Sequence, residues 1–228
     1  MKKLKVLLSA ISMLTFGAAN AGTLVLDSFN YDPVLALEVS SIAPPVDTGS
    51  VISVESGATA DYTLTFVSGS GADGVDGNVF GAGNLNYNED SLANGSLFIE
   101  YSIDAPVGFN TLDFTGYDAF YFDIIAIDGS GGFDIEITLT DSDGTMISAT
   151  YTVDAVGIFN AEFSAMTADV DYVDFDFSMV LTASTNITSA GNGDDFTLAE
   201  VGLVPEPSAL AILGLGLIGL GLRRRKLV

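Results

Sequence analysis

The sequence predicts an all-β protein, because apolar side chains recur at every second position in several segments. The alternation is regular over residues 97–103, 135–139 and 173–179, where every second residue is large and apolar. A period of two is typical of antiparallel strands that are buried on one face. No segment has the 3.6-residue period of a long amphipathic helix. Many short strands at this spacing favour an antiparallel β-sandwich, of jelly-roll type, over an α/β fold.

Turn-forming residues separate the expected strands. Asp141 to Gly144 (DSDG) lies between two β-rich runs and predicts a hairpin, and Gly129 to Gly132 (GSGG) ends the run before them. Residues 69–83 are glycine-rich and are expected to form a loop, which either carries function or is a disordered tip. The expected strands lie near residues 23–29, 34–40, 51–54, 61–67, 84–87, 96–103, 119–127, 133–140, 145–153, 158–163, 171–182 and 196–203.

The charges are distributed very unevenly along the chain. All seven Lys and Arg residues lie within residues 2–5 and 223–226, whereas the thirty Asp and Glu residues lie between Asp27 and Glu206. A body without cations repels phosphate backbones and anionic lipid headgroups, so we expect no nucleic-acid binding. Disorder is also disfavoured, because hydrophobic residues make up 48% of the chain.

The chain contains neither Cys nor His. This excludes disulfides, thiol nucleophiles, Ser-His-Asp triads and His-bound metals, so we expect a protein that is not an enzyme. The alternative is a secreted glycoside hydrolase, whose chemistry needs only two carboxylates. Asp134 and Glu136 form one such pair, since residues two apart on a strand share a face.

The first 21 residues predict a secretory signal peptide. A cationic start at residues 1–5 precedes an apolar stretch, and Ala19 and Ala21 supply the small residues that a signal peptidase recognises. We expect cleavage after Ala21. The remaining chain then divides into an acidic β-sandwich body, residues 22–204, as one domain or two, and a C-terminal segment, residues 205–228.

The C-terminal segment combines a short motif, an apolar run and a basic end. Pro205, Glu206 and Pro207 are followed by an uncharged run, residues 208–222, which as a helix would reach roughly 22 Å against about 30 Å of hydrocarbon. The run is short for a permanent span and predicts a transient transmembrane helix. The basic residues that follow are expected to keep the end of the chain in the cytoplasm; they are Arg223, Arg224, Arg225 and Lys226.

This three-part ending resembles the PEP-CTERM sorting signal of Gram-negative bacteria. The resemblance implies an exosortase as partner, a membrane-embedded protease that recognises Pro205, Glu206 and Pro207 and removes the tail. It also implies export across the inner membrane and a final place at the cell surface or in an extracellular matrix, such as that of an exopolysaccharide-rich biofilm. An ordinary membrane anchor is the alternative interpretation.

Three segments of the body are similar to strands of jelly-roll carbohydrate-binding modules. They are LVLDSFNYD, starting at Leu24, LDFTGYDAFYFDI, starting at Leu112, and DDFTLAEVGLV, starting at Asp194. The resemblance implies a structural Ca²⁺ between the first and last strands, with Asp27, Asp194 and Asp195 as ligands. It also implies an association with polysaccharide. Tyrosines that could stack on sugar rings are Tyr87, Tyr101, Tyr117, Tyr121, Tyr151 and Tyr172, unless these rings form part of the core or of strand edges.

Overall fold

The computed structural model describes residues 23–30, 35–40, 46–52, 58–69, 74–80, 83–102, 111–129, 131–168 and 175–206. Residues 23–204 form one compact unit. A second unit consists of residues 1–22 and 205–228, of which only Pro205 and Glu206 are among the described residues. The expected signal peptide, with Ala19 and Ala21, and the expected transmembrane helix therefore lie outside the described part of the chain.

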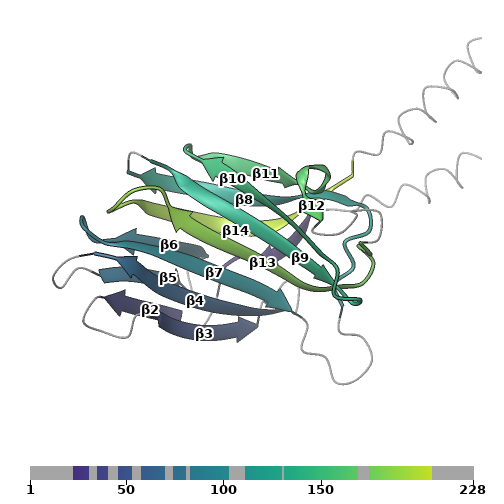
Figure 1. Ribbon diagram of the computed structural model, residues 1–228, viewed down its shortest axis with the longest axis horizontal. Coiled ribbons are helices and arrows are strands. Elements are labelled where there is room, and N and C mark those ends of the chain that lie inside the picture. Colours follow the sequence, from purple (N-terminus) through teal and green to yellow (C-terminus); the bar gives the residue numbers. More distant parts are fainter. Residues whose placement is uncertain are drawn as a thin grey trace, which may run out of the picture. The chain divides into compact units, whose positions relative to one another are not determined.

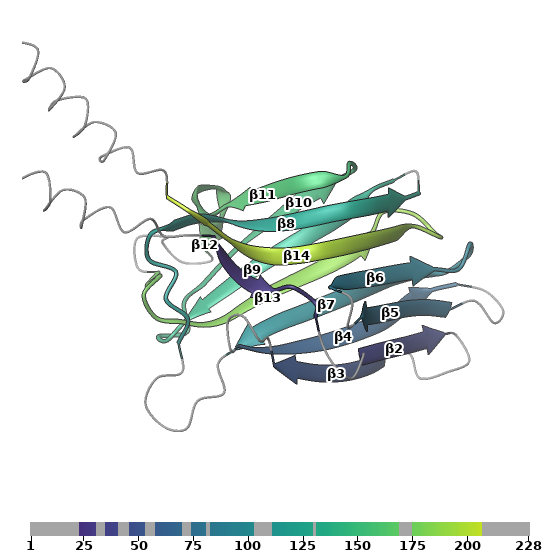
Figure 2. The same cartoon turned by 180° about the vertical axis from the view of Figure 1, so that it is seen from behind.

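The body consists of two seven-stranded sheets, which confirms the predicted antiparallel β-sandwich (Figures 1 and 2). Sheet B lies in front of sheet A in Figure 1, and Figure 2 shows the reverse side. In order across sheet A, the strands are β11 (Gly157–Glu162), β8 (Tyr117–Asp128), β14 (Asp195–Pro205), β6 (Asn84–Glu89), β5 (Gly74–Phe80) and β2 (Leu35–Ser40), and β1 (Leu24–Asp27) also pairs with β14. In order across sheet B, they are β12 (Thr167–Ala168), β10 (Met146–Val153), β9 (Phe133–Asp141), β13 (Val180–Ser189), β7 (Asn94–Ser102), β4 (Thr59–Ser68) and β3 (Val46–Ile52).

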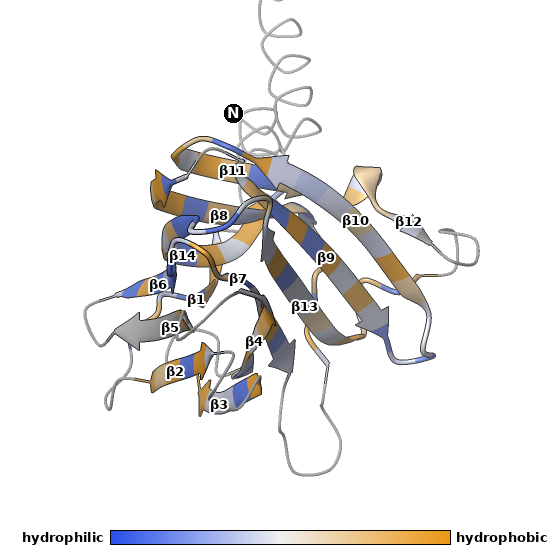
Figure 3. Ribbon diagram, turned by 60° about the vertical axis from the view of Figure 1, so that its left-hand side comes forward, coloured by the Kyte–Doolittle hydropathy of each residue, from blue (hydrophilic) through white to orange (hydrophobic). Residues whose placement is uncertain are grey.

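The core lies between the facing sides of the two sheets. Along β9, buried Phe133, Ile135, Ile137 and Leu139 alternate with exposed or half-buried polar residues, and the alternation is visible as hydropathy bands in Figure 3. Aromatic rings join the layers, since Phe133 of sheet B packs edge-on against Phe196 of sheet A, with ring centres 4.8 Å apart. The apolar residues that recur at every second position in the sequence are thus the residues that are buried in the core.

The predicted hairpin at Asp141 to Gly144 is confirmed. Strands β9 and β10 pair in antiparallel register on either side of it. The buried carboxylate of Asp141 shapes the turn, because its Oδ1 accepts hydrogen bonds from the backbone N–H groups of Asp143 and Thr145 at 3.0 and 2.8 Å. Gly144 takes the positive φ of 84° that the turn requires.

Two sequence expectations are wrong. Within the glycine-rich segment 69–83, residues 74–80 form β5 rather than a loop, because the backbone pairs with β6 on one side and β2 on the other. The strand expected near 171–182 is not extended over residues 175–179, where a turn joins Met179 N–H to the carbonyl of Asp176 at 3.1 Å. The strand begins instead at Val180 and continues to Ser189.

Candidate functional site

The expected sorting motif begins where the last strand ends. Strand β14 runs to Pro205, and Glu206 follows it as an exposed residue, while Pro207 and residues 208–228 lie outside the described part. Just upstream, Leu203 is fully buried and lies opposite Leu24 of β1 in antiparallel register. The first and last strands of the body are therefore neighbours, with little chain between the last buried residue and the motif.

No helix within the described ranges is both long enough and apolar enough to cross a membrane. The run expected to cross, residues 208–222, and the basic residues Arg223, Arg224, Arg225 and Lys226 lie beyond those ranges.

Asp27 is a fully buried residue at the end of β1. Its Oδ1 accepts a hydrogen bond from the backbone N–H of Phe29 at 2.7 Å, and its Oδ2 accepts one from the hydroxyl of Tyr62 at 2.5 Å. Phe29 is also buried and has a positive φ of 53°. Because Tyr62 belongs to sheet B, Asp27 connects the two sheets through a hydrogen bond.

The three acids expected to share a calcium ion are not brought together. Asp27 lies opposite Val201, and Asp195 is six residues further back along β14, about 20 Å at the usual rise of a strand. Across the described residues, no group of three or more acidic side chains is arranged to hold a metal ion. Calcium binding by the protein stays a prediction, without a three-residue site to support it.

Asp194 and Asp195 instead belong to a hydrogen-bonded cluster around Glu89, which we call the Glu89 cluster: Tyr87, Glu89, Asn94, Gly95, Ser189, Gly191, Asp194 and Asp195. Oε1 of Glu89 accepts hydrogen bonds from the hydroxyl of Tyr87, the backbone N–H of Gly95 and the hydroxyl of Ser189, at 2.5, 2.8 and 2.9 Å. Its Oε2 faces the N–H of Asp194 at 3.3 Å. Oδ1 of Asp195 accepts from the N–H of Glu89 at 2.8 Å.

The cluster joins four strands from both sheets without using a cation. Glu89 is only 7% exposed and Tyr87 is fully buried. Burial, and then the hydrogen bond to Glu89, raise the pKa of Tyr87 well above its ordinary value. In a body that lacks Lys, Arg and His, buried carboxylates are stabilised by hydroxyl and N–H donors instead. We assign the cluster a structural role that the sequence did not reveal, since Glu89 ends an ordinary alternating strand.

A second tyrosine–carboxylate pair lies on the outer side of sheet A. The Tyr121 hydroxyl donates a hydrogen bond to Glu200, and burial followed by this bond raises the pKa of Tyr121. Of the other tyrosines considered for sugar stacking, Tyr87 and Tyr101 are buried, Tyr117 and Tyr151 are half-buried, and Tyr172 lies outside the described residues. None of these four described tyrosines, Tyr87, Tyr101, Tyr117 and Tyr151, is fully exposed.

The outer face of sheet B is polar, and five of its strands align their side chains in rows. We call three of these rows the hydroxyl face. Most members carry a hydroxyl or an amide, and all are half-buried or exposed. The rows, from β4 to β10, are Asp61–Glu100–Ser184–Thr138–Ser148, Thr63–Phe98–Asn186–Glu136–Thr150 and Thr65–Ser96–Thr188–Asp134–Thr152.

Phe98 lies in the middle row of the hydroxyl face. It is half-buried and points away from the core, since its neighbours Leu97 and Ile99 are fully buried on the inner side. Thr63 and Asn186 flank it on the adjacent strands, about 4.8 Å away in the direction of the hydrogen bonds. The face thus offers an aromatic ring surrounded by groups that donate and accept hydrogen bonds.

The carboxylate pair considered for glycoside hydrolysis also lies on this face. Asp134 and Glu136 are both exposed, and Oδ1 of Asp134 accepts a hydrogen bond from the hydroxyl of Thr152 at 2.7 Å. Both side chains are exposed to solvent, whereas the general acid of a typical hydrolase pair is buried. The pair thus places two carboxylates among the hydroxyl and amide groups of the hydroxyl face.

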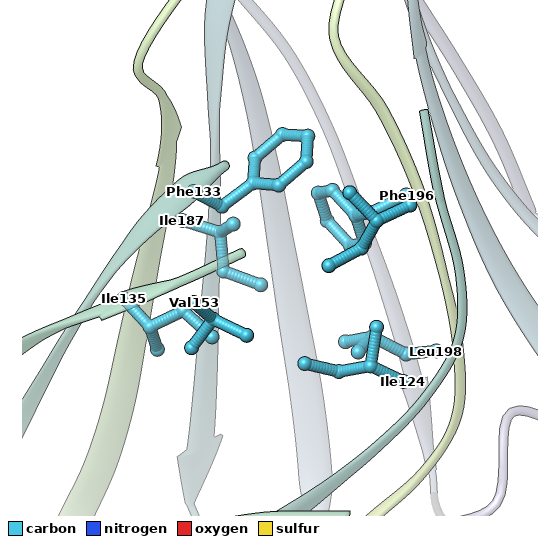
Figure 4. A pocket seen from close by; sticks show the side chains of 8 residues that line it. Ile124, Phe133, Ile135, Val153, Ile187, Phe196 and Leu198 are labelled. Carbon is cyan, nitrogen blue, oxygen red and sulfur yellow. The ribbon is translucent and has the colours of Figure 1, made fainter. Parts of the chain in front are cut away.

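A narrow crevice between the sheets is lined only by apolar side chains. Phe133, Ile135 and Ile187 of sheet B face Phe196 and Leu198 of sheet A across it (Figure 4). Such a lining offers no hydrogen-bond partner to orient a polar ligand. We interpret the crevice as a small packing gap of the core.

Comparison with known proteins identifies the C-terminal motif. Residues 203–226 match the family described as the PEP-CTERM protein-sorting motif. The chain thus carries this motif, as its sequence suggested, and the motif indicates export and sorting toward the cell surface by an exosortase. A search of curated protein sequences found no match.

Solved structures that align with this chain include carbohydrate-binding modules. The family 11 module of the cellulosomal cellulase Lic26A-Cel5E of Clostridium thermocellum has 14% identity and a TM-score of 0.41, with 82% of this chain and 96% of that chain covered. A solution structure of CtCBM11 has 16% identity and a TM-score of 0.45, covering 84% and 99%. An exo-β-agarase has 14% identity and a TM-score of 0.40, covering 80% of this chain and 25% of that one.

Proposed function

We propose that the protein is a non-catalytic component of the cell surface or extracellular matrix of a Gram-negative bacterium, processed by signal peptidase and an exosortase and associated with polysaccharide. The sorting motif at residues 203–226 carries the first part of the proposal. Leu203 is buried in the body, and Pro205, Glu206 and Pro207 follow it closely. Removal of the residues after Pro207 would therefore leave every core strand intact.

The hydroxyl face supports the polysaccharide part. Sugar hydroxyls both donate and accept hydrogen bonds, and the rows of Thr, Ser and Asn offer matching groups over five neighbouring strands. The ring of Phe98 supplies an apolar surface for the C–H side of a sugar ring. The body carries no Lys or Arg, so a neutral polymer fits this face better than an anionic one.

Affinity electrophoresis tests the proposal. Gels containing a neutral β-glucan, a polyuronate or the producer's own exopolysaccharide are compared with a polymer-free gel. We expect the neutral polymer to retard the protein, and Phe98→Ala to weaken this retardation about tenfold, which corresponds to about 1.4 kcal/mol. Leu92→Ala removes an apolar side chain that is 52% exposed elsewhere on the body and should change nothing.

Two results would count against the proposal. Absence of retardation in all three polymers would exclude the polysaccharide part. Recovery of a chain that still ends at Val228 from the producer's surface, determined by intact mass and C-terminal peptide, would exclude processing by an exosortase and favour an ordinary anchor.

A further inference from the structure

The outer strand β11 leaves one edge of sheet A open. Among the described strands, β11 pairs only with β8, and it lies at the end of the sheet. Its segment Gly157–Glu162 contains no Pro and no Lys, which are common devices against edge-to-edge pairing. An edge of this kind presents backbone N–H and C=O groups to any strand that can approach it.

The opposite edge of sheet A is protected, and so is the neighbouring edge of sheet B. On β2, the N–H of Glu38 already donates a hydrogen bond to Oδ2 of Asp47 at 3.1 Å. On the side near β11, sheet B ends in β12, which has only two residues. Of these three edges, that of β11 is the long one whose central residues carry no side-chain hydrogen bond among the described residues, since the hydroxyl of Tyr151 reaches only the carbonyl of the last residue, Glu162.

Three exposed aliphatic side chains accompany this edge. Ile158 is 70% exposed, Val156 is 61% exposed and Ile125 of β8 is 49% exposed. Ile158 lies opposite Asp123 of β8, and both point to the outer side of the sheet, because the adjacent Phe122 and Ile124 belong to the core. Such an apolar group beside an open edge is typical of an interaction surface.

Charge indicates which partner fits the edge. The body carries only carboxylates, so two copies repel each other over most of their surface. From Gly157 to Ala161, by contrast, β11 carries no charged residue. A cationic partner would find stronger attraction on the acidic surfaces elsewhere, whereas a second acidic body meets least repulsion here.

We propose that two copies of this chain pair through β11 in antiparallel orientation, so that sheet A continues across a two-fold axis. The outer face of sheet A continues from one copy to the other only if an outward-pointing residue of one β11 lies opposite an outward-pointing residue of the other. Ile158 of one copy then lies opposite Ile158, Asn160 or Glu162 of the other, for a two-fold axis at residue 158, 159 or 160, and in each case the exposed aliphatic groups of both copies lie near the axis. The hydroxyl of Tyr151 already donates to the carbonyl of Glu162 at 3.0 Å, so the pairing centres on residues 157–161.

Single cysteines test this pairing directly, because the chain has none of its own. We would express the full chain in its producer in three versions, which carry Ile158→Cys, Asn160→Cys, or both substitutions in the same chain. The yield of disulfide-linked dimers is measured after export. Directly opposite residues bring their Cβ atoms close enough for a disulfide. The three experiments cover two-fold axes at residues 158, 160 and 159. Thr152→Cys, on an exposed position of β10, is the matched control.

We expect at least one of the three to give about tenfold more dimer than Thr152→Cys, with a larger yield at high salt, which screens the repulsion between acidic bodies. Light scattering of the full chain in detergent gives a second readout. There, Ile158→Glu should lower the dimer fraction by about tenfold through like charges across the edge. Dimer yields at the control level for all three cysteine experiments, or an unchanged dimer fraction for Ile158→Glu, would overturn the proposal.

Discussion

Replacement of Glu89 by Ala should destabilise the body strongly, although Glu89 lies outside the hydroxyl face. The side chain accepts hydrogen bonds from Tyr87, Gly95 and Ser189 and lies 3.3 Å from the N–H of Asp194. Ser189 has a second acceptor in the carbonyl of Gly191 at 2.8 Å. Two well-bonded buried donors, the Tyr87 hydroxyl and the Gly95 N–H, would lose their partner.

An unsatisfied buried donor costs about 1–3 kcal/mol, so Glu89→Ala should lower the free energy of unfolding by about 4 kcal/mol. This is a large share of the roughly 5–15 kcal/mol of a typical domain. Glu89→Gln is the matched control. Its carbonyl oxygen can replace Oε1, and its amide is left facing the Asp194 N–H, so the expected cost is about 1 kcal/mol.

Urea unfolding followed by far-UV circular dichroism measures both values. A double-mutant cycle then isolates the hydroxyl, because Tyr87→Phe removes the donor that Glu89→Ala would leave unsatisfied. The double variant should be less destabilised than the sum of the two single variants, by about 1–3 kcal/mol. Additive effects, or a Glu89→Ala cost no larger than that of Glu89→Gln, would refute this account of the cluster.

Three further predictions concern strain, pH and calcium. Gly129→Ala should lower the melting temperature by roughly 6 °C or more, because a Cβ at φ +129° would clash with the carboxylate of Asp194. Gly157→Ala, at φ +128° with open space around it, should cost only about 1 kcal/mol. Burial and the hydrogen bond to Glu89 raise the pKa of Tyr87 from 10.0, so its stabilisation is complete below pH 10 and declines as the pH rises above 10. Urea midpoints measured across this range should fall less steeply in Tyr87→Phe. If the body binds calcium, millimolar Ca²⁺ should raise the melting temperature and a chelator should lower it; no change with either would exclude the ion.

The sequence predicted those strands whose inward positions hold large apolar residues. The β9–β10 hairpin is the clearest case, since alternation and the DSDG turn both lie in one short segment. Strand β13 was largely missed because its inward residues include the small Ala183, Thr185 and Ser189. Strand β5 was missed because glycine disfavours strands locally, whereas here pairing on both sides determines the conformation.

The candidate surfaces were less predictable than the strands. The PEP-CTERM motif is contiguous and could be recognised from the residues alone. The hydroxyl face depends on the register of five strands, so that Thr63, Phe98 and Asn186 become neighbours although they are far apart in the chain. The Glu89 cluster similarly joins residues about a hundred positions apart. Period and composition contain no information about such registers.

The continuity of β14 with the sorting motif also determines how the body would bear a mechanical load. A protein held at a surface through its C-terminal end is pulled along the axis of β14, which ends at Pro205. Strand β14 is flanked by β8 on one side and by β6 and β1 on the other. Their hydrogen bonds lie across the direction of pull, so they must break together in shear rather than one after another. If the body is attached through its C-terminal end, the load on β14 would therefore be shared by β8, β6 and β1.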